Sequence, residues 1–490
     1  MRKATDRQQR LDSQPIGSVD LNLKCRDEII PILLALRAIY IDEEVRQVIL
    51  RLVARDVNAE SSRKLGRRGM SYWEIVVLAA VRLGCNLDYD KLQNLAEQHR
   101  ALRRTMEIGD WESRSFDWRC IQDNVTLLRP ETLERINQLV VKMGHGLVPE
   151  GAKTARVDSF VMGTNIHYPT DSSLIRDGLR KVLACAAELA EGSGLSGWRQ
   201  HEHLYRKVRD LARELDRVAG RKGADYRARL QEHYRPLLDL AGMVLDRADE
   251  LRAQLLATTV CSDAELMALD AELRQFTRLT RQVCDVARRR VLEGQSVPNC
   301  EKLFSLFETH TQLYKRGKAG EPVQFGRQAL IYEDGVGFVT HAYLMPRDQD
   351  DRDVVVQQTR KVQALLAGAI ERGSFDRGFH SPENQRELAK ILAHACLPMS
   401  GSRQSAEQEE QATVEFRQSR QRHPGIESAI NALQMGNGLA RCRDRTERGF
   451  SRYLQLGILG RNLHVLGKLL LAREDAECQA AYSRRKKIAA

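Results

Sequence analysis

The chain of 490 residues is too long for one compact core, so we expect two to four domains. Apolar residues make up 42% of it, an ordinary share that excludes a wholly disordered chain. Lysine and arginine number 77 against 66 aspartates and glutamates, and the resulting net charge of +11 favours a polyanionic partner such as nucleic acid.

The ten cysteines include no CxxC pair and have no histidine-rich surroundings. This pattern argues against zinc binding and for reduced, mostly buried thiols in a cytosolic protein. The basic start of the sequence is not followed by the apolar segment of a signal peptide, and no uncharged apolar run is long enough to span a membrane. We therefore expect a cytoplasmic protein without a membrane partner.

Residues 1–24 are polar, and we expect a flexible N-terminus there. Residues 25–150 show helical periodicity, for example in "DEEVRQVILRLVARDV", whose apolar residues fall on one face. The stretch "SFDWRCIQDNVTLLRPETLERINQLVV" predicts two further helices, the second beginning at Pro130. This part of the sequence thus predicts an all-α domain.

Within that domain, "LAAVRLGCNLDYDKLQNLAEQHRALRRTM" predicts a helix that ends at Gly84, a short polar turn and a basic second helix. A helix-turn-helix needs this order to set its second helix into the major groove of DNA. A plain helical hairpin has the same spacing and is the alternative. The candidate DNA contacts on the second helix are Lys91, Arg100, Arg103 and Arg104.

The pattern changes in "TARVDSFVMGTNIHY", where β-branched and aromatic residues predict a strand, or a hairpin turned at Gly163 and Thr164. The following "PTD" carries start signals for a helix. Asp158 interrupts the apolar run, and a buried carboxylate is costly unless a metal or hydrogen bonds satisfy it. We interpret residues 151–192 as the first part of an α/β core.

Residues 193–300 repeat apolar side chains at spacings of three and four, the pattern of amphipathic helices packed against each other. We expect a long all-α insertion with a solvated charged face; a DNA-contacting face is the alternative. Strands return in 301–470, where two runs in "EPVQFGRQALIYEDGVGFVTHAYLM" flank an Asp334-Gly335 hairpin turn and helices follow. Residues 471–490 are expected to form a disordered basic tail.

The order of these elements resembles a ribonuclease-H-like α/β fold that is interrupted by a helical insertion. Phosphate-binding glycine loops and the GxSxG elbow are absent from the sequence, which disfavours nucleotide hydrolysis and acyl transfer. Three carboxylates instead lie in separate core-like segments, at Asp158, Asp376 and Glu427. Such a set suits Mg²⁺, which a few carboxylates hold together with water and phosphate oxygens.

Five segments, in order, narrow this interpretation to a family. They are "VDSFVMGTNIHYPTDSSLIRDGLR", "FETHTQLYKRGKAGEPVQFGRQALIYED", "FDRGFHSPENQREL", "HPGIESAINALQMGNGLARCRDRTERGF" and "LGILGRNLHVLG". Together they resemble bacterial insertion-sequence transposases of the DDE class, closest to the ISNCY-type group. The resemblance covers roughly residues 70–467.

The resemblance implies that Asp158, Asp376 and Glu427 are the catalytic acids of a ribonuclease-H-like core and hold two Mg²⁺ ions, with Mn²⁺ as a substitute. Glu410 and Glu415 are the alternatives for the third acid. It also implies double-stranded DNA as the partner, both terminal repeats and target, bound by a homo-oligomer. A bacterial enzyme of this class would be cytoplasmic and associated with the nucleoid.

Further residues near these segments are candidates for contact with DNA or with the metal site. Basic side chains predicted to meet phosphates are Lys315, Arg316, Lys318, Arg422, Arg441 and Arg443. Related transposases often carry a basic residue about two helical turns past the glutamate, and Arg441 is a loose substitute for it. His167 and Asp171 either support the metal site or have a structural role as a turn and a helix cap.

Two rival interpretations remain open at this stage. One is a metal-dependent nuclease that cuts DNA without strand transfer. The other is a non-catalytic DNA-binding protein from a decayed element.

Overall fold

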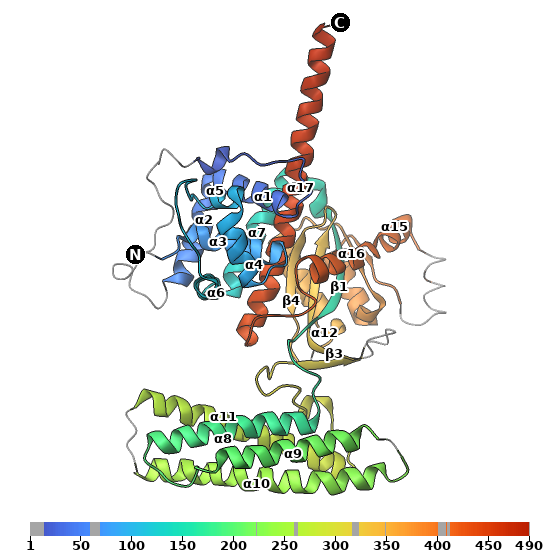
Figure 1. The fold of residues 1–490 in the computed structure, drawn as a ribbon. Helices are drawn as coiled ribbons and strands as arrows, with labels where there is room; N and C mark the ends of the chain where they lie inside the picture. Colours follow the sequence, from blue (N-terminus) through green and yellow to red (C-terminus); the bar gives the residue numbers. More distant parts are fainter. Residues whose placement is uncertain are drawn as a thin grey trace. The chain divides into compact units, whose positions relative to one another are not determined.

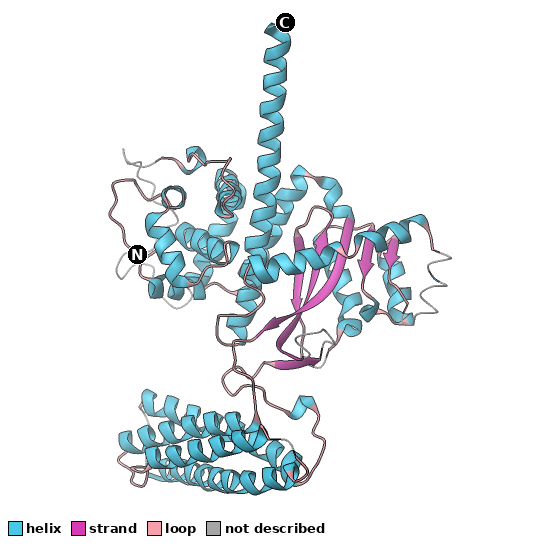
Figure 2. Ribbon diagram, turned by 45° about the vertical axis from the view of Figure 1, so that its right-hand side comes forward, coloured by secondary structure: helices cyan, strands magenta, loops and turns pink. Residues whose placement is uncertain are grey.

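The computed structural model describes residues 14–58, 69–221, 223–258, 263–315, 323–347, 349–399, 408 and 412–489. The chain divides into two compact units, one formed by residues 1–163 and 327–490 and the other by residues 164–326. The architecture is mixed α/β, and its described strands belong to one mixed sheet of six strands (Figures 1 and 2).

The predicted helical character of residues 25–150 is confirmed. The helices are α1 (Ile29–Ile41), α2 (Glu43–Val57), α3 (Tyr72–Gly84), α4 (Tyr89–Gln98), α5 (Arg100–Thr105), α6 (Trp118–Thr126) and α7 (Pro130–Leu147). As predicted, α7 begins at Pro130, where a proline costs no helical hydrogen bond. The predicted second helix of the hairpin is divided at His99, whose Nδ1 accepts a hydrogen bond from the Leu102 N–H and so caps α5.

The N-terminal helices share their apolar core with the sheet. Helix α17 (Glu447–Ala489) packs on α1, α3 and α7, and one apolar cluster includes Leu78, Val140, Phe160 and Leu459. Two glycines permit this approach, since a Cβ on Gly460 would lie 2.6 Å from the backbone of Gly84. The predicted domain 25–150 and residues 327–470 of the predicted second core part therefore belong to one compact unit, because α17 packs on both, whereas residues 301–326 belong to the other unit.

Both predicted flexible ends need correction. Residues 1–13 lie outside the described part of the chain, but Ile16, Val19 and Leu21 are buried in the apolar cluster, so 1–24 is not uniformly loose. At the other end, α17 continues as a helix to Ala489 where 471–490 was expected to be disordered (Figure 1). The strong helix formers Ala, Leu, Arg, Lys and Glu in that stretch account for the difference.

The strands are β1 (Thr154–Gly163), β2 (Gln312–Lys315), β3 (Val323–Asp334), β4 (Val339–Leu344), β5 (Arg372–Phe375) and β6 (His394–Cys396). Their order is β2-β3-β1-β5-β6, and β4 also pairs with β3. Strand β5 runs parallel to β1 and to β6, whereas β3 is antiparallel to β2 and β4. The alternative hairpin at Gly163 does not form, because β1 runs unbroken to that residue.

The predicted hairpin at Asp334-Gly335 is confirmed between β3 and β4. The Asp334 Oδ1 atom accepts hydrogen bonds from the backbone N–H groups of Val336, Gly337 and Phe338. Its other oxygen lies 2.7 Å from His145 Nε2 of α7. One carboxylate thus shapes the turn and ties it to the N-terminal helices.

The two faces of the sheet bury different side chains because the strand period is two. Val157, Tyr332 and Phe375 share a cluster with α12 (Asp351–Leu365) and α13 (Pro382–Ile391). Phe160 points to the opposite face and belongs to the cluster that contains α17. Two short helices, α15 (Val414–Arg422) and α16 (Gly425–Asn431), contact β5 and β1 respectively.

Residues 164–326 form a helical unit with its own apolar cluster. Its helices are α8 (Asp171–Gly192), α9 (His201–Ala219), α10 (Tyr226–Thr258) and α11 (Ala264–Ala287). Helix α8 packs on α9 and α11, burying Leu179 and Val182, so the insertion begins well before the predicted residue 193. None of the described helices has the length and apolarity that a membrane span would require.

Candidate active site

Asp158 within β1 and Asp376 directly after β5 follow a matched pair of residues on these neighbouring parallel strands. The register of β1 and β5 pairs Thr154 with Arg372 and ends with Val157 opposite Phe375, one residue before each aspartate. Val157 and Phe375 are buried in the same cluster, on the face covered by α12. Because successive side chains alternate, the two aspartates belong to the opposite face of the sheet. Residues far apart in sequence are thereby brought side by side.

Glu427 lies on α16, which contacts β1. The helix buries Ile426 and Ala429 and leaves Glu427 exposed. The first residue of α16, Gly425, packs tightly against β1, since a Cβ there would collide with the Arg156 guanidinium. Arg156 precedes Asp158 by two residues and so shares its face of the strand. The third predicted acid is therefore carried by a helix anchored beside the first.

His423 connects the helix to the two strands. Its Nδ1 lies 3.1 Å from the Ser374 hydroxyl on β5, two residues before Asp376. Burial lowers the pKa of the His423 imidazole, and the Asp376 and Glu427 carboxylates oppose this shift. Both carboxylates thus act on the same imidazole, which brings the second and third predicted acids into one electrostatic neighbourhood.

The acids differ in their exposure. Asp158 is half-buried, and one of its oxygens accepts a hydrogen bond of 2.7 Å from the Ser159 N–H. Asp376 and Glu427 are exposed. In the described part of the chain, no three His, Cys, Asp or Glu side chains form a group that could hold a metal ion. The carboxylate pair on β1 and β5 nevertheless suits Mg²⁺, which proteins often bind through one or two carboxylates with water and substrate phosphates.

A cavity of about 440 Å³ lies toward the amino ends of β1 and β5, on the face that carries Arg156 and Ser374. It is lined by charged and polar side chains that include Arg156, Arg372, Ser374, Glu415, Gln418 and Arg422. Arg156 Nη2 lies 2.7 Å from Glu333 Oε2, and its Nη1 donates to the Arg422 carbonyl. Arg422, a predicted phosphate contact, and Glu415, an alternative for the third acid, both line this cavity.

Sequence reasoning missed Arg156, Ser374 and His423. Arg156 and Ser374 each precede a predicted catalytic aspartate by two residues, and strand periodicity alone would have placed them on the same face. His423 precedes Glu427 by four residues. The intervening Pro424 and Gly425 are residues that break helices, so the sequence did not indicate that the two side chains are neighbours. Only the packing of α15 and α16 on the sheet reveals this neighbour.

The predicted DNA contacts on α4 and α5 fall into two groups. Lys91 and Arg100 are mostly exposed. The Lys91 ammonium pairs with Asp88, and the Arg100 guanidinium pairs with Asp110. Arg103 donates instead to the carbonyls of Glu112 and Arg114, and Arg104 binds Asp110. Arg103 and Arg104 therefore hold the loop that follows α5, as Arg100 also does through Asp110. Lys91 and Arg100 are the better placed to contact DNA because their side chains are more than 70% exposed.

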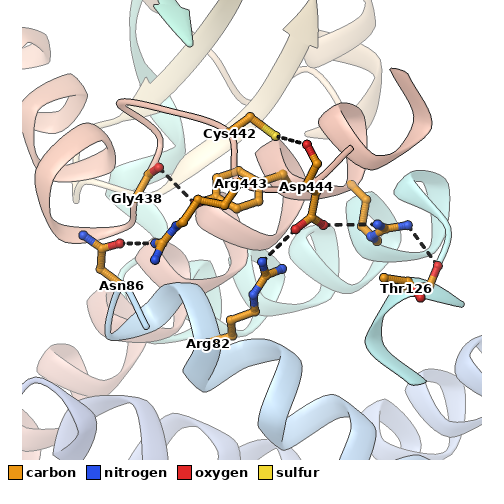
Figure 3. Close-up of polar contacts among 9 residues, drawn as sticks. Arg82, Asn86, Thr126, Gly438, Cys442, Arg443 and Asp444 are labelled. Atoms are coloured by element: carbon orange, nitrogen blue, oxygen red, sulfur yellow. Dashed lines mark hydrogen bonds and ion pairs between the residues drawn. The ribbon is translucent and has the colours of Figure 1, made fainter. Parts of the chain in front are cut away.

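The α3–α4 turn is fastened to the segment that follows α16 (Figure 3). Arg443 donates to the Tyr453 hydroxyl over 2.8 Å and to Asn86 Oδ1. Asn86, at φ 52°, in turn donates to the Met435 carbonyl. Arg443 therefore has a structural role in this contact. Figure 3 shows Arg443 and Asn86 approaching each other from the two segments.

A buried ion-pair network reinforces the same joint. Asp444 binds Arg82 of α3 at 2.7 Å and Arg452 of α17 at 3.1 Å, and Arg452 also donates to the Thr126 carbonyl (Figure 3). Burial by itself lowers the pKa of the Arg82 guanidinium, but the charge and hydrogen bond of Asp444, together with Tyr89 and Tyr453, raise the pKa above its ordinary value. The Asp444 carboxylate thus joins α3 to α17, and Arg452 extends the network to α6.

The segment from residue 440 to 442 connects this joint to β1. Gly163 of β1 donates to the Ala440 carbonyl, and its own carbonyl accepts from the Cys442 N–H. Arg441 is exposed and forms the bridge partner of Gly163. Arg441 thus lies beside Gly163, which ends β1 five residues past Asp158.

The remaining predicted residues lie on the other unit or outside the described part. Lys315 ends β2 and is exposed, while Arg316, Lys318 and Glu410 are outside the described residues. Thr170, not Asp171, caps α8, and Asp171 pairs with Arg290 at 2.8 Å. His167 lies 3.7 Å from Asp177. These ion pairs agree with the structural alternative for His167 and Asp171.

Comparisons with known proteins gave no match. No protein-family model matches the chain, and neither the search of curated proteins nor that of solved structures found a match.

Proposed function

We propose that the protein is a DNA transposase that cleaves and joins DNA strands with two divalent metal ions. The observation that carries the proposal is the adjacent placement of Asp158 and Asp376 on parallel strands, on the sheet face that α16 and Glu427 adjoin. Three acids in this arrangement agree with the resemblance of the sequence to DDE transposases.

We further infer that the sheet belongs to a ribonuclease-H-like core. The order β4-β3-β1-β5-β6, with antiparallel pairing of β3 to β4 and parallel pairing of β1, β5 and β6, supports this topology. The helical unit 164–326 interrupts this core after β1, as expected for an insertion between the first and later strands.

In this proposal, Asp158 and Asp376 are the metal ligands held most rigidly, because Asp158 lies within the hydrogen-bonded strand β1 and Asp376 directly follows β5. When bound, the divalent ions would activate water or a DNA 3′-hydroxyl and stabilise the leaving oxygen during in-line attack on phosphorus. Glu427 lies on a helix instead of a strand, so its approach to the aspartates depends on how α16 packs. His423 and Ser374 fix that packing on the β5 side.

Binding to DNA is assigned to α4 and its surroundings, with Lys91 and Arg100 as phosphate contacts. The order of α3, a short turn and α4 supports the helix-turn-helix interpretation, although most of the basic residues predicted for the second helix lie on α5. We further propose that the protein acts as a homo-oligomer that pairs two transposon ends. It would be associated with the bacterial nucleoid.

The test supplies supercoiled DNA that bears the terminal repeats of the element, with Mg²⁺, to the wild type, Asp158→Ala and Asp376→Asn. Cleaved and joined products from the wild type alone support transposition. Glu371→Gln is the matched control, because this carboxylate precedes β5 at its opposite end and is about half exposed. Cleavage without joining would favour a nuclease, and DNA binding without either product would favour a non-catalytic protein.

A further inference from the structure

An exposed aromatic side chain lies at one end of the helical unit 164–326. Tyr168 is 71% exposed, and its ring meets the Phe325 ring edge-on at 5.4 Å. Phe325 also contacts Phe304, at 5.5 Å between ring centroids. The hydrogen bond from the Thr164 N–H to the Phe325 carbonyl fixes the backbone near Tyr168 against β3. Tyr168 is therefore supported from behind while most of its surface remains open.

Lys315 shares the face of the β2–β3 ribbon that carries Phe325. The register pairs Lys315 with Val323 and Leu313 with Phe325. Directly paired residues of antiparallel strands point to the same side, and so do residues two apart. Lys315 is thus a diagonal neighbour of the Phe325 ring on which Tyr168 packs.

Two more positively charged side chains, Lys302 and Arg290, lie near Lys315. Burial lowers the pKa of the Lys302 ammonium, and the positive charges of Arg290 and Lys315 lower it further, against the opposing charge of Asp171. Arg290 is 43% exposed and pairs with Asp171 at 2.8 Å. It lies in a π-helix (Arg288–Leu292) that follows α11, a rare element found often at functional sites. Three cations are thus held near one carboxylate.

We propose that Tyr168, Arg290, Lys302, Lys315 and Phe325, here named the Tyr168 surface, bind single-stranded DNA. An exposed ring beside a group of cations has the chemistry that single strands require, because an unpaired base stacks on the ring while the phosphates meet the cations. Duplex DNA offers the cations its phosphates but keeps its base faces stacked within the helix. The crowding of like charges is relieved when a polyanion binds.

The inference takes DNA as the partner from the proposed function but requires no catalysis. Fluorescence anisotropy with the full chain, in EDTA, measures the affinity for a labelled oligo-dT strand and for the same strand annealed to oligo-dA. Tyr168→Ala should weaken single-strand binding by about tenfold and leave duplex binding nearly unchanged. Tyr168→Phe, which keeps the ring, should bind like the wild type.

The cations have a separate signature. Lys315→Gln should reduce the slope of log affinity against log salt by about 0.7 for the single strand, the value for one phosphate contact. Arg213→Gln, at an exposed cation of α9 that pairs only loosely with Asp210 (3.9 Å), is the control and should leave the slope unchanged.

Single-strand affinity that is unchanged in Tyr168→Ala would overturn the inference, and so would an equal loss for single strand and duplex. Asp158→Ala should bind oligo-dT as the wild type does. A protein that binds the single strand through Tyr168 but never cleaves DNA would refute the proposed function and leave this inference standing.

Discussion

Replacing Asp444 by asparagine tests whether the α3–α4 turn is fastened to α17 by a buried charge. The Asp444 side chain is 5% exposed and binds Arg82 and Arg452, which are 2% and 8% exposed. Arg82 also lies over the Tyr89 ring at 4.0 Å, so it cannot reach water without moving α4. Asp444→Asn keeps the shape of the side chain and removes the charge that both guanidinium groups share.

The expected cost follows from the two cations left unpaired. Breaking a buried ion pair by removing one partner costs about 3–5 kcal/mol. The unit that contains Asp444 spans residues 1–163 and 327–490, and at about 2.1 cal/mol/K of unfolding entropy per residue this cost lowers its Tm by roughly 4–7 °C. An exposed ion pair should contribute far less, because water solvates its partners and screens them.

Differential scanning calorimetry of the full chain measures this shift directly. The control is Glu477→Gln, which removes the Arg473–Glu477 pair on α17, where both side chains are more than 60% exposed. We expect no measurable change in Tm for the control. Equal melting of Asp444→Asn and the wild type would refute the reasoning that the buried network stabilises this joint.

Two further predictions concern stability. Burial, with Lys468 and Arg461 nearby, lowers the pKa of His464 from 6.5 to about 4, so the unfolded chain binds a proton more readily between these values. Stability should therefore fall as the pH is lowered from about 6.5 to 4, and urea titrations of His464→Gln should show a weaker dependence over that range. In α17, Gly467→Ala would press a methyl group into the Pro31 backbone and should cost roughly 1–3 kcal/mol or more in denaturant unfolding. Gly146→Ala, where nothing lies within 4 Å, should instead gain about 0.4–1 kcal/mol, and a loss there would contradict the packing argument.

Local patterns in the sequence predicted the elements well. Pro130, the Asp334-Gly335 turn and the start of α8 were each found where short-range chemistry puts them. These signals depend on backbone preferences that a few neighbouring residues determine. Asp158 could be named because β1 was recognised locally, whereas β5 was not predicted as a strand and Asp376 was named through the family resemblance.

Long-range packing could not be predicted in the same way. Nothing in the local pattern indicates that α17 covers both the N-terminal helices and the sheet, or that α8 leaves the core for the helical unit. The commitment of Arg103, Arg104 and Arg443 to internal partners was equally hidden, since a basic residue has the same letter whether it binds DNA or a carbonyl. Tertiary contacts decide between these uses.

The central claim is that Asp158 and Asp376 hold divalent metal together on one face of the sheet. Electron paramagnetic resonance of Mn²⁺, titrated into the protein bound to its terminal-repeat DNA, measures this most directly. The account predicts that the wild type and Glu371→Gln bind Mn²⁺ alike, and that Asp158→Asn and Asp376→Asn each lose that binding while still binding DNA. Undiminished Mn²⁺ binding in both aspartate variants would contradict it.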